Sequence, residues 1–239
     1  MTAEPLVRVS DLRKVYGANP VLDGVGLDVH HGEAVALLGA NGAGKTTLLR
    51  ILATLARPSR GTATVAGHDC VREAERVRAV IGLVAHGTHV YEDLSAVENL
   101  TFWSTLAGSR PRPSDLAAAL AAVDLDRCAT ERVRTFSAGM KRRLALARFV
   151  LARPRVLLLD EPFASLDQQA RKWLDDYLQA FKAAGGAIVM ATHSFGRGLA
   201  VADRIAILAD GRVALDTPTA GLGPGEIQRL YALCTEDHP

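Results

Sequence analysis

Residues 39–47 read Gly-Ala-Asn-Gly-Ala-Gly-Lys-Thr-Thr, which fits the pattern G-x-x-x-x-G-K-[ST] from Gly39 to Thr46. The apolar run 33–38 comes directly before it, as a buried strand would, and the helix-favouring run 47–53 comes directly after it. Strand, glycine-rich loop and helix in this order are the setting in which the pattern binds phosphate. We therefore predict a phosphate-binding loop here rather than an ordinary glycine-rich turn.

The chemistry of this loop points to a nucleotide polyphosphate. Its glycines let the backbone curl so that successive N–H groups point inward, and the helix N-terminus adds partial positive charge. Lys45 has the length to reach the β- and γ-phosphates, and the Thr46 hydroxyl can ligate Mg²⁺. The predicted nucleotide-binding residues in this loop are Gly39, Asn41, Gly42, Gly44, Lys45, Thr46 and Thr47.

Two adjacent carboxylates follow a second apolar run. Residues 156–159 read Val-Leu-Leu-Leu, which is typical of a central parallel strand, and Asp160 and Glu161 come next. Ligands bind at the carboxyl ends of such strands. Neighbouring strand residues point to opposite faces, so the two carboxylates should have different roles. We predict that Asp160 holds Mg²⁺ and that Glu161 positions or deprotonates a water molecule beside the γ-phosphate.

Composition excludes several other classes of protein. The 239 residues carry a net charge of only +2 without a long basic run, so no nucleic-acid partner is predicted. The three cysteines lie far apart and form no CxxC, which argues against a disulfide framework or a zinc site and favours a reducing compartment. We see no signal peptide, and no apolar run reaches the roughly 18 residues of a membrane span, so any membrane part is expected from another chain.

The middle of the sequence changes from alternating strands and helices to helices alone. Ser95 and Glu98 form a capping box that opens a helix, and Ser114-Asp115 is predicted to cap a second one. Ser137 is a predicted N-cap before the basic run 141–148, where helix N–H groups can meet a phosphate. Taken alone the pattern favours a plain capped helix, and its place shortly before Asp160 strengthens the phosphate interpretation. We expect a single domain, 1–239, with a nucleotide-binding α/β core at 1–85 and 154–220, an inserted helical subdomain at 86–153, and a weakly patterned tail at 221–239.

Taken together, these motifs resemble the nucleotide-binding subunits of ATP-binding-cassette (ABC) transporters. The resemblance covers residues 6 to about 216, and its motifs occur in the family's order. They are the Walker A loop 39–46, the signature Ser137-Ala138-Gly139, Walker B at 157–161, the D-loop Ser165-Leu166-Asp167, the switch histidine His193, and Tyr16 at the place of the adenine-stacking aromatic.

This resemblance implies a fold and a mechanism. The fold is a P-loop NTPase with a RecA-like core, an antiparallel β subdomain and an inserted α-helical subdomain. Glu161 and His193 are implied as catalytic residues, and Tyr16, Ser137, Gly139 and Asp167 as further contacts to ATP. Two such subunits pack head to tail, as a homodimer or heterodimer, with each ATP between Walker A of one and the signature of the other. They work with an integral membrane permease, so the chain is expected in the cytoplasm, peripheral on the inner face of the cell membrane.

Two features depart from the family pattern. The signature has Phe136 for leucine, Ala138 for glycine and Met140 for glutamine, and the more serious departure follows the strand at 81–84. The family has a glutamine that senses Mg²⁺ after the strand at 81–84, whereas this chain has His86. Histidine can donate or accept a hydrogen bond, so His86 is assigned to the metal site in place of glutamine. With His89 it also forms His-x-x-His, which invites a metal or heme interpretation, but no fixed partner stands nearby and a loop position is favoured.

Finer features are similar to the ATPase of heme exporters in cytochrome c maturation. The alternatives are an exporter of drugs, lipids or polysaccharide, a soluble ABC ATPase acting on a scaffold such as that of iron–sulfur assembly, and a nucleotide-binding module without hydrolysis. The stretches that favour the heme exporter are residues 49–58, 160–167, Gln168-Gln169, and Gly185-Gly186 before Thr192-His193.

Overall fold

The computed structural model describes residues 4–84, 89–164, 166–193, 195 and 199–235. Its contacts divide the chain into two compact units. We call them the sheet unit, Met1–Leu83 with Arg155–Pro162 and Leu178–Pro239, and the helical unit, Val84–Pro154 with Phe163–Tyr177. The helical unit thus takes in residues 163–177, a stretch that the sequence analysis assigned to the nucleotide-binding core.

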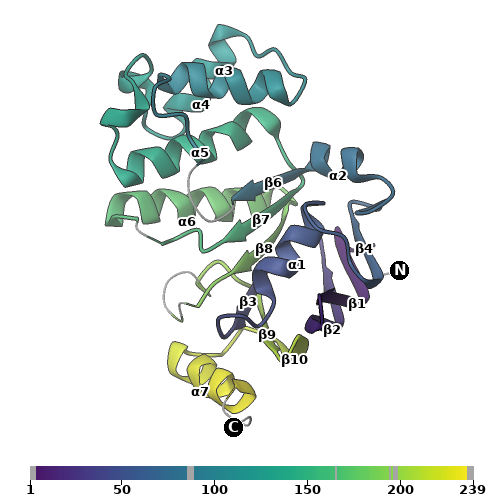
Figure 1. Ribbon diagram of the computed structural model, residues 1–239. Helices are drawn as coiled ribbons and strands as arrows, with labels where there is room; N and C mark the ends of the chain where they lie inside the picture. The colour runs from purple at the N-terminus through teal and green to yellow at the C-terminus, as the bar shows by residue number, and fades with distance from the viewer. Residues whose placement is uncertain (1–3, 85–88, 165, 194, 196–198, 236–239) are drawn as a thin grey trace. The chain divides into compact units, whose positions relative to one another are not determined.

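A six-stranded sheet forms the centre of the sheet unit. Its order is β10-β9-β3-β8-β7-β6, and β3 pairs in parallel with β8 and β9, as β7 does with β8 (Figure 1). Every residue of β3, β7 and β8 is buried, which explains why these strands read as unbroken apolar runs. The strands are β3 (Ala34–Gly39), β6 (Ile81–Val84), β7 (Val156–Asp160), β8 (Ala187–Ala191), β9 (Arg204–Ala209) and β10 (Arg212–Pro218).

A second sheet is antiparallel. It has the order β2-β1-β4-β5, with β1 paired to both β2 and β4. Buried and exposed residues alternate along much of β1 and β2, as they do in a sheet with one covered face. Its strands are β1 (Val7–Tyr16), β2 (Asn19–Val29), β4 (Arg60–Val65) and β5 (His68–Asp69).

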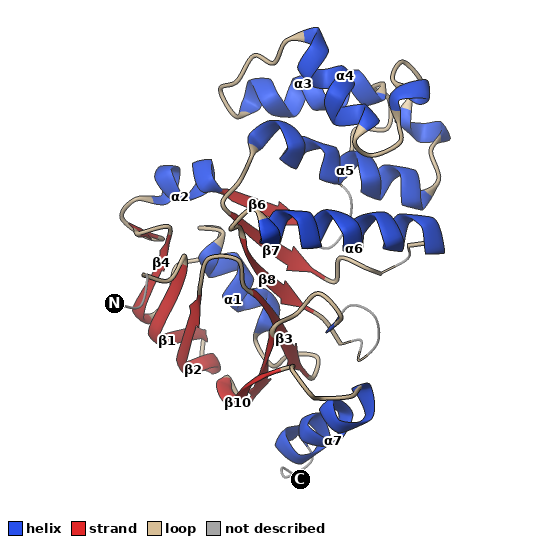
Figure 2. Cartoon of the chain, turned by 180° about the vertical axis from the view of Figure 1, so that it is seen from behind, coloured by secondary structure: helices blue, strands red, loops and turns tan. Residues whose placement is uncertain are grey.

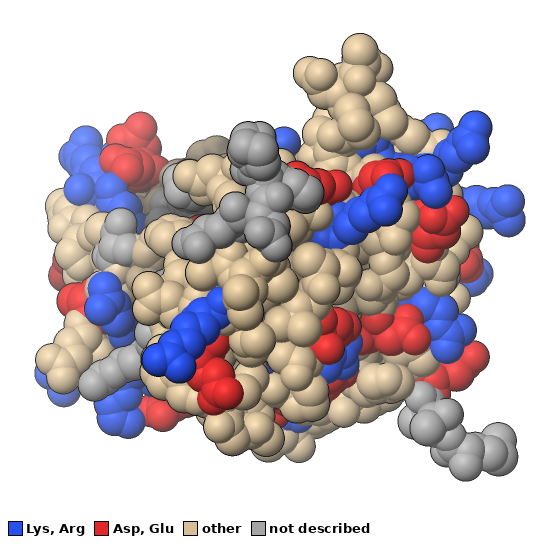
Figure 3. All heavy atoms as spheres, turned by 90° about the horizontal axis from the view of Figure 1, so that it is seen from below, with Lys and Arg blue, Asp and Glu red and all other residues tan. Residues whose placement is uncertain are grey.

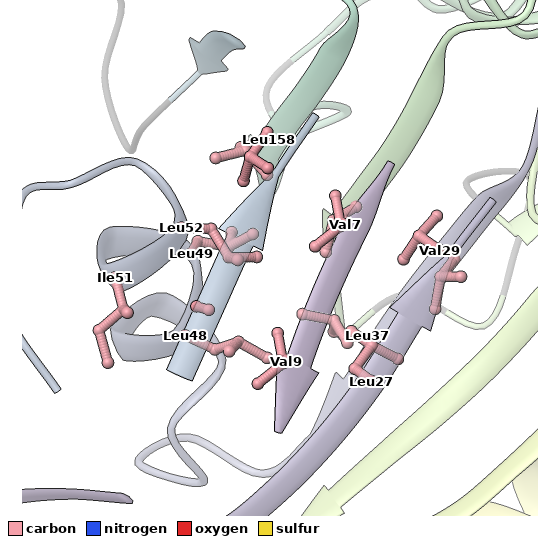
Figure 4. Packing of buried hydrophobic residues seen from close by; sticks show 14 of the residues in the cluster. Val7, Val9, Leu27, Val29, Leu37, Leu48, Leu49, Ile51, Leu52 and Leu158 are labelled. Atoms are coloured by element: carbon pink, nitrogen blue, oxygen red, sulfur yellow. The ribbon is translucent and has the colours of Figure 1, made fainter. Parts of the chain in front are cut away.

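Helix α1 (Lys45–Leu52) lies between the two sheets (Figure 2). Leu48, Leu49 and Leu52 are buried on it and join one cluster with side chains of β1, β2, β3 and β7 (Figure 4). Because α1 begins directly after the glycine-rich loop, this packing anchors the loop from its helical end. The sheet unit also holds α2 (Ala74–Val80) and α7 (Pro224–Thr235).

Helix α7 lies in the tail, where the sequence pattern was weak. Ile227 is its one buried residue among those described, so little of an apolar stripe is present to reveal the helix. Pro224 opens the helix at a position where proline is well tolerated.

The helical unit has a core of its own. It contains α3 (Ala96–Leu106), α4 (Pro113–Ala121), α5 (Ala138–Ala152) and the first part of α6 (Gln168–Ala183), with 3₁₀ turns at Asp126–Cys128 and Val133–Thr135. Its buried side chains come mainly from α3, α4 and α5 and from the turns between them.

The helix starts in this unit test two predictions. The capping box at Ser95 and Glu98 is confirmed. The predicted start at Ser114-Asp115 is wrong, because Arg112 is the N-cap and Asp115 is the third residue of the helix. There the Asp115 carboxylate reaches back and accepts from the Arg112 N–H at 3.1 Å.

Within the described part of the chain, no helix combines the length and apolar character needed to cross a membrane. On the face shown in Figure 3, acidic and basic side chains are interspersed rather than gathered by sign. That distribution matches the small net charge of the sequence.

Candidate functional site

The glycine-rich loop connects β3 to α1, as its sequence predicts. Gly44 is the N-cap of α1 and has a φ of 102°, in the left-handed region that favours glycine. A Cβ added there would lie 2.5 Å from Leu22 Cδ2 and 2.8 Å from the Val21 carbonyl oxygen. Strand β2 therefore packs so closely against the end of the loop that glycine alone fits.

The middle of the loop is open to solvent. Ala40, Asn41 and Gly42 are exposed, whereas Gly39 and Gly44 at the two ends are buried. The first turn of α1 has no acidic residue, so its free N–H groups keep their partial positive charge. Exposed backbone at a helix N-terminus of this kind is suited to an anionic ligand.

Lys45 folds back over this loop. Its Nζ donates to the carbonyl oxygens of Gly39 at 2.6 Å and Ala40 at 3.0 Å. Burial lowers the pKa of Lys45, and the nearby carboxylates of Glu161 and Asp160 act in the opposite direction. The ammonium group is thus held beside the exposed loop backbone, in reach of a phosphate bound there.

Thr46 and Asp160 form a direct pair. The Thr46 Oγ1 donates to Asp160 Oδ2 at 2.9 Å, and Asp160 is a buried residue at the end of β7. A hydroxyl and a carboxylate are oxygen ligands that Mg²⁺ accepts. The described residues hold no group of three or more His, Cys, Asp and Glu side chains arranged for a metal ion. Mg²⁺ commonly binds through one or two protein oxygens and completes its coordination with phosphate oxygens and water.

The third residue assigned to the metal site, His86, lies outside the described residues. His89 is described, is exposed and has a φ of 50°. The role of His86 therefore stays a prediction.

Glu161 is not a strand residue, contrary to the prediction from alternation. Strand β7 ends at Asp160, and Glu161 has a φ of 48°, in the left-handed region. Alternation of faces in a strand therefore does not determine where the Glu161 side chain points. Its direction is set by its contacts.

The Glu161 carboxylate is contacted at both oxygens. Oε1 lies 2.7 Å from His193 Nδ1, and Oε2 accepts from Thr192 Oγ1 at 3.3 Å. The Glu161 side chain is 18% exposed, whereas that of His193 is 71% exposed. The carboxylate is thus enclosed on the Thr192 side and reachable by solvent on the His193 side.

Strand pairing explains why these distant residues meet. In the parallel pair of β7 and β8, Asp160 lies opposite Ala191. The Glu161 N–H then donates to the Ala191 carbonyl at 2.9 Å. Residues 161, 192 and 193 therefore leave neighbouring strands at the same edge of the sheet.

Tyr16 stands at the end of β1, in the hairpin that leads to β2. The residue is 45% exposed, and Lys14 Nζ lies 4.5 Å from the centroid of its ring. The same β2 supplies Val21 and Leu22, the residues that a side chain at Gly44 would meet. The hairpin thus connects an exposed aromatic ring, able to stack on a base, to the loop that can hold phosphate.

The signature residues belong to the helical unit. Ser137 is exposed and is the N-cap of α5, where its Oγ accepts from the Met140 N–H at 3.2 Å, as predicted. Gly139 is buried, and a Cβ there would lie 3.0 Å from Asp167 Oδ2. Asp167 also caps α6, because its Oδ1 accepts from the Ala170 N–H at 2.7 Å. The signature and the Asp167 segment are therefore packed together within one unit.

Sequence reasoning missed one site residue. Thr192 appeared only as the neighbour of His193, yet its hydroxyl contacts the Glu161 carboxylate. A threonine at the end of an apolar strand is a common feature, and no local pattern marks it as part of a site. The register of β7 and β8 was needed to find it.

The fold and this loop define a P-loop nucleotide-binding protein. The family model described as "ABC transporter" matches residues 22–164, and the chain belongs to this family. The predicted fold class is confirmed: a P-loop NTPase with an antiparallel β subdomain and helical parts. The chain carries the ATP-binding ATPase domain of the family.

Comparisons with individual proteins support membership of this family. The chain is 38% identical to the daunorubicin resistance ATP-binding protein DrrA3 of Streptomyces coeruleorubidus, over 88% of this chain and 67% of the relative. It is 35% identical to the Nod factor export ATP-binding protein I of Ralstonia nicotianae, over 87% of this chain and 65% of that protein. The chain thus spans about two thirds of these relatives, and neither name mentions heme. A solved structure described as the ATP binding subunit of an ABC transporter has a TM-score of 0.82 and 29% identity, covering 96% of this chain and 94% of its own.

Proposed function

We propose that this chain is the ATP-hydrolysing subunit of an ABC exporter, acting as a dimer with an integral membrane permease. The observation that carries the proposal is the Glu161 carboxylate. Glu161 follows Asp160 in the sequence, and Asp160 is paired with Thr46. Glu161 Oε1 lies 2.7 Å from His193 Nδ1. A carboxylate beside a candidate cation site is suited to accept a proton from the water that attacks a γ-phosphate.

The loop residues bind and orient the nucleotide. Lys45 exchanges its bonds to the Gly39 and Ala40 carbonyls for contacts to the β- and γ-phosphates. The N–H groups at the start of α1 donate to the phosphates, and Tyr16 stacks on adenine. Thr46 and Asp160 hold Mg²⁺, which when bound neutralises charge on the phosphate oxygens.

Glu161 and His193 act on the water. Glu161 accepts a proton from the water. At the same time the water oxygen forms a bond to the γ-phosphorus, and the bond between the γ-phosphorus and the oxygen that leaves with ADP breaks. His193 keeps the carboxylate oriented through its Nδ1 contact at 2.7 Å. The His193 ring is exposed enough to reach the γ-phosphate as well.

A second subunit completes the site. Ser137 is exposed at the start of α5, a helix of 15 residues without an acidic residue in its first turn. This end of the helix favours an anion that the same chain's Lys45 does not hold. In the proposed dimer, Ser137 of the partner subunit and the backbone of Gly139 of the partner subunit contact the γ-phosphate. ATP then closes the dimer, and hydrolysis lets it open.

Two cargoes are retained for the exporter. The relative named for daunorubicin resistance favours a drug of that kind. The stretches of sequence similar to heme exporter ATPases keep heme as the second candidate. Either assignment places the chain in the cytoplasm, on the inner face of the membrane, through contact with its permease.

Co-purification with a readout of cargo tests this proposal. The chain is isolated from native membranes in mild detergent, its membrane partner is identified, and the complex is reconstituted in liposomes. We expect ATP turnover that E161Q lowers by about 100-fold or more, and stimulation by daunorubicin more than by heme. Stimulation by heme alone would reverse the choice of cargo. A soluble scaffold in place of a permease would overturn the assignment to transport.

A further inference from the structure

Thr192 occupies a buried position against the candidate catalytic carboxylate. The residue is 3% exposed. Its backbone N–H donates to the carbonyl of Leu37 at 3.1 Å, which fixes it to the strand that leads into the phosphate-binding loop. Its Oγ1 donates to Glu161 Oε2 at 3.3 Å. One residue thus connects the base of the loop to the carboxylate.

Glu161 needs such support because of its own backbone. A φ of 48° is uncommon for a residue with a side chain and persists where the surroundings hold it. The Glu161 N–H bond to the Ala191 carbonyl fixes the backbone rather than the side chain. His193 contacts Oε1 from the exposed side, so Thr192 supplies the contact from the enclosed side.

We propose that Thr192 is a positioning residue for catalysis: its hydroxyl holds Oε2 so that Oε1 is the oxygen presented to His193 and the attacking water. This inference rests on the proposed function of Glu161 as the base. Misplacing a catalytic group by about 1 Å can slow the chemical step about 100-fold. The hydroxyl of Thr192, rather than its shape, is therefore the feature that matters.

Substitutions at position 192 distinguish the effect of the hydroxyl on turnover from the effect of side-chain packing. Valine keeps the shape of threonine and removes the hydroxyl, whereas serine keeps the hydroxyl and removes the methyl group. Thr219 provides a matched control, because its hydroxyl donates to the Ala202 carbonyl at 2.7 Å, within the same unit. T219V loses a comparable hydrogen bond without touching Glu161.

The experiment measures ATP turnover, affinity for a fluorescent ATP analogue and melting temperature of the full chain. We expect T192V to lower kcat about 10- to 100-fold, the cost of losing a hydrogen bond to a charged group, with KM within about twofold of the wild type. T192S should recover most of the lost turnover, and T219V should keep the wild-type kcat. If T192V does not fold, the comparison of T192A with T192S serves the same purpose.

A double variant links the effect to Glu161. T192V should cause no further loss of turnover in an E161Q background, since the group that it positions is already gone. A wild-type kcat in T192V, or T192S as slow as T192V, would overturn the inference. The proposed function is tested separately: if E161Q itself turned over ATP normally, the role of Glu161 would be wrong whatever Thr192 does.

Discussion

The Thr46 hydroxyl donates to the Asp160 carboxylate across 2.9 Å, although 114 positions separate the two residues in the sequence. They meet because α1 and β7 contact each other inside the sheet unit. Both are oxygen ligands of the kind that Mg²⁺ binds, and the pair lies next to Lys45 and the loop backbone. The pair therefore marks the proposed cation site.

Weakening this pair should raise the Mg²⁺ concentration that the enzyme needs. T46V removes the hydroxyl ligand and leaves the loop backbone unchanged. We expect half-maximal ATP turnover to shift to a Mg²⁺ concentration at least about tenfold higher, with excess EDTA stopping the wild type altogether. A titration of MgCl₂ at constant ATP measures the Mg²⁺ concentration that gives half-maximal turnover. An unchanged midpoint would remove Thr46 from the metal site.

Replacing Glu161 should separate binding from hydrolysis. E161Q keeps a side chain of the same size but loses the proton acceptor, so turnover should fall by about 100-fold or more. Nucleotide binding should persist, and the variant should be trapped as an ATP-bound dimer. Phosphate release and a sizing column run with ATP and Mg²⁺ report the two properties. A monomer under those conditions would count strongly against the proposed dimer.

Lys45 should be required for ATP affinity. K45A removes the ammonium group that now bonds to Gly39 and Ala40, so the phosphates lose a charged donor. We expect binding of a fluorescent ATP analogue to weaken by at least about 100-fold. Equilibrium titration measures the affinity, and the melting temperature confirms folding. Retained micromolar binding in K45A would refute the role given to Lys45.

Gly44 should tolerate no side chain. G44A puts a Cβ 2.5 Å from Leu22 Cδ2 at a φ of 102°, so both a clash and an unfavourable backbone contribute. We expect the free energy of unfolding to fall by more than about 2 kcal/mol. G221A is the control, since Gly221 has a φ of 84° with open space around it and should lose only about 1 kcal/mol. Urea unfolding measures the free energy of unfolding of both variants. Equal losses in G44A and G221A would show that the close approach of β2 to Gly44 is unimportant.

The capping box of α3 should make the helical unit sensitive to acid. Hydrogen bonds from the Ser95 N–H and then the Ser95 hydroxyl lower the pKa of Glu98 below its ordinary value of 4.5, and desolvation opposes them. The folded state thus binds the carboxylate proton more weakly than the unfolded state does. The stabilisation from Glu98 is full above about pH 4.5 and is lost as the pH falls through the folded pKa.

Glu98→Gln is the test of that pH dependence. It should be less stable than the wild type near neutrality, and the difference should shrink as the solution is made more acidic. Urea unfolding at several pH values, followed by far-UV circular dichroism, measures the difference. A gap between the two proteins that is constant with pH would mean that the charge of Glu98 contributes nothing.

Features that follow from neighbouring residues could be predicted from the sequence. The strand, loop and helix around Gly44 and Lys45 are adjacent in the chain, so their order was enough to predict the phosphate-binding loop. The caps at Ser95 and Ser137 depend on hydrogen bonds within one turn, and both were found. Helix α7 was missed because its short buried face provides almost no periodic signal.

Features that depend on strand pairing could not be predicted in this way. The alternation of faces in a strand gave a wrong prediction for Glu161, since its φ of 48° places this residue outside the strand. The contact of Thr192 with Glu161 requires Asp160 to lie opposite Ala191, and no local pattern contains that register. The burial of Gly139 against Asp167 likewise joins two segments that are distant in the sequence.

The phosphate-binding loop, the acidic pair at the end of β7 and the family could all be recognised from consecutive residues, because the local chemistry of each stretch is distinctive. Which side chains share the site follows only from the folded chain: Thr46 lies with Asp160, and Thr192 and His193 lie with Glu161. Packing of α1 and pairing of β7 with β8 set these distances, and both arise from contacts between residues far apart in the chain.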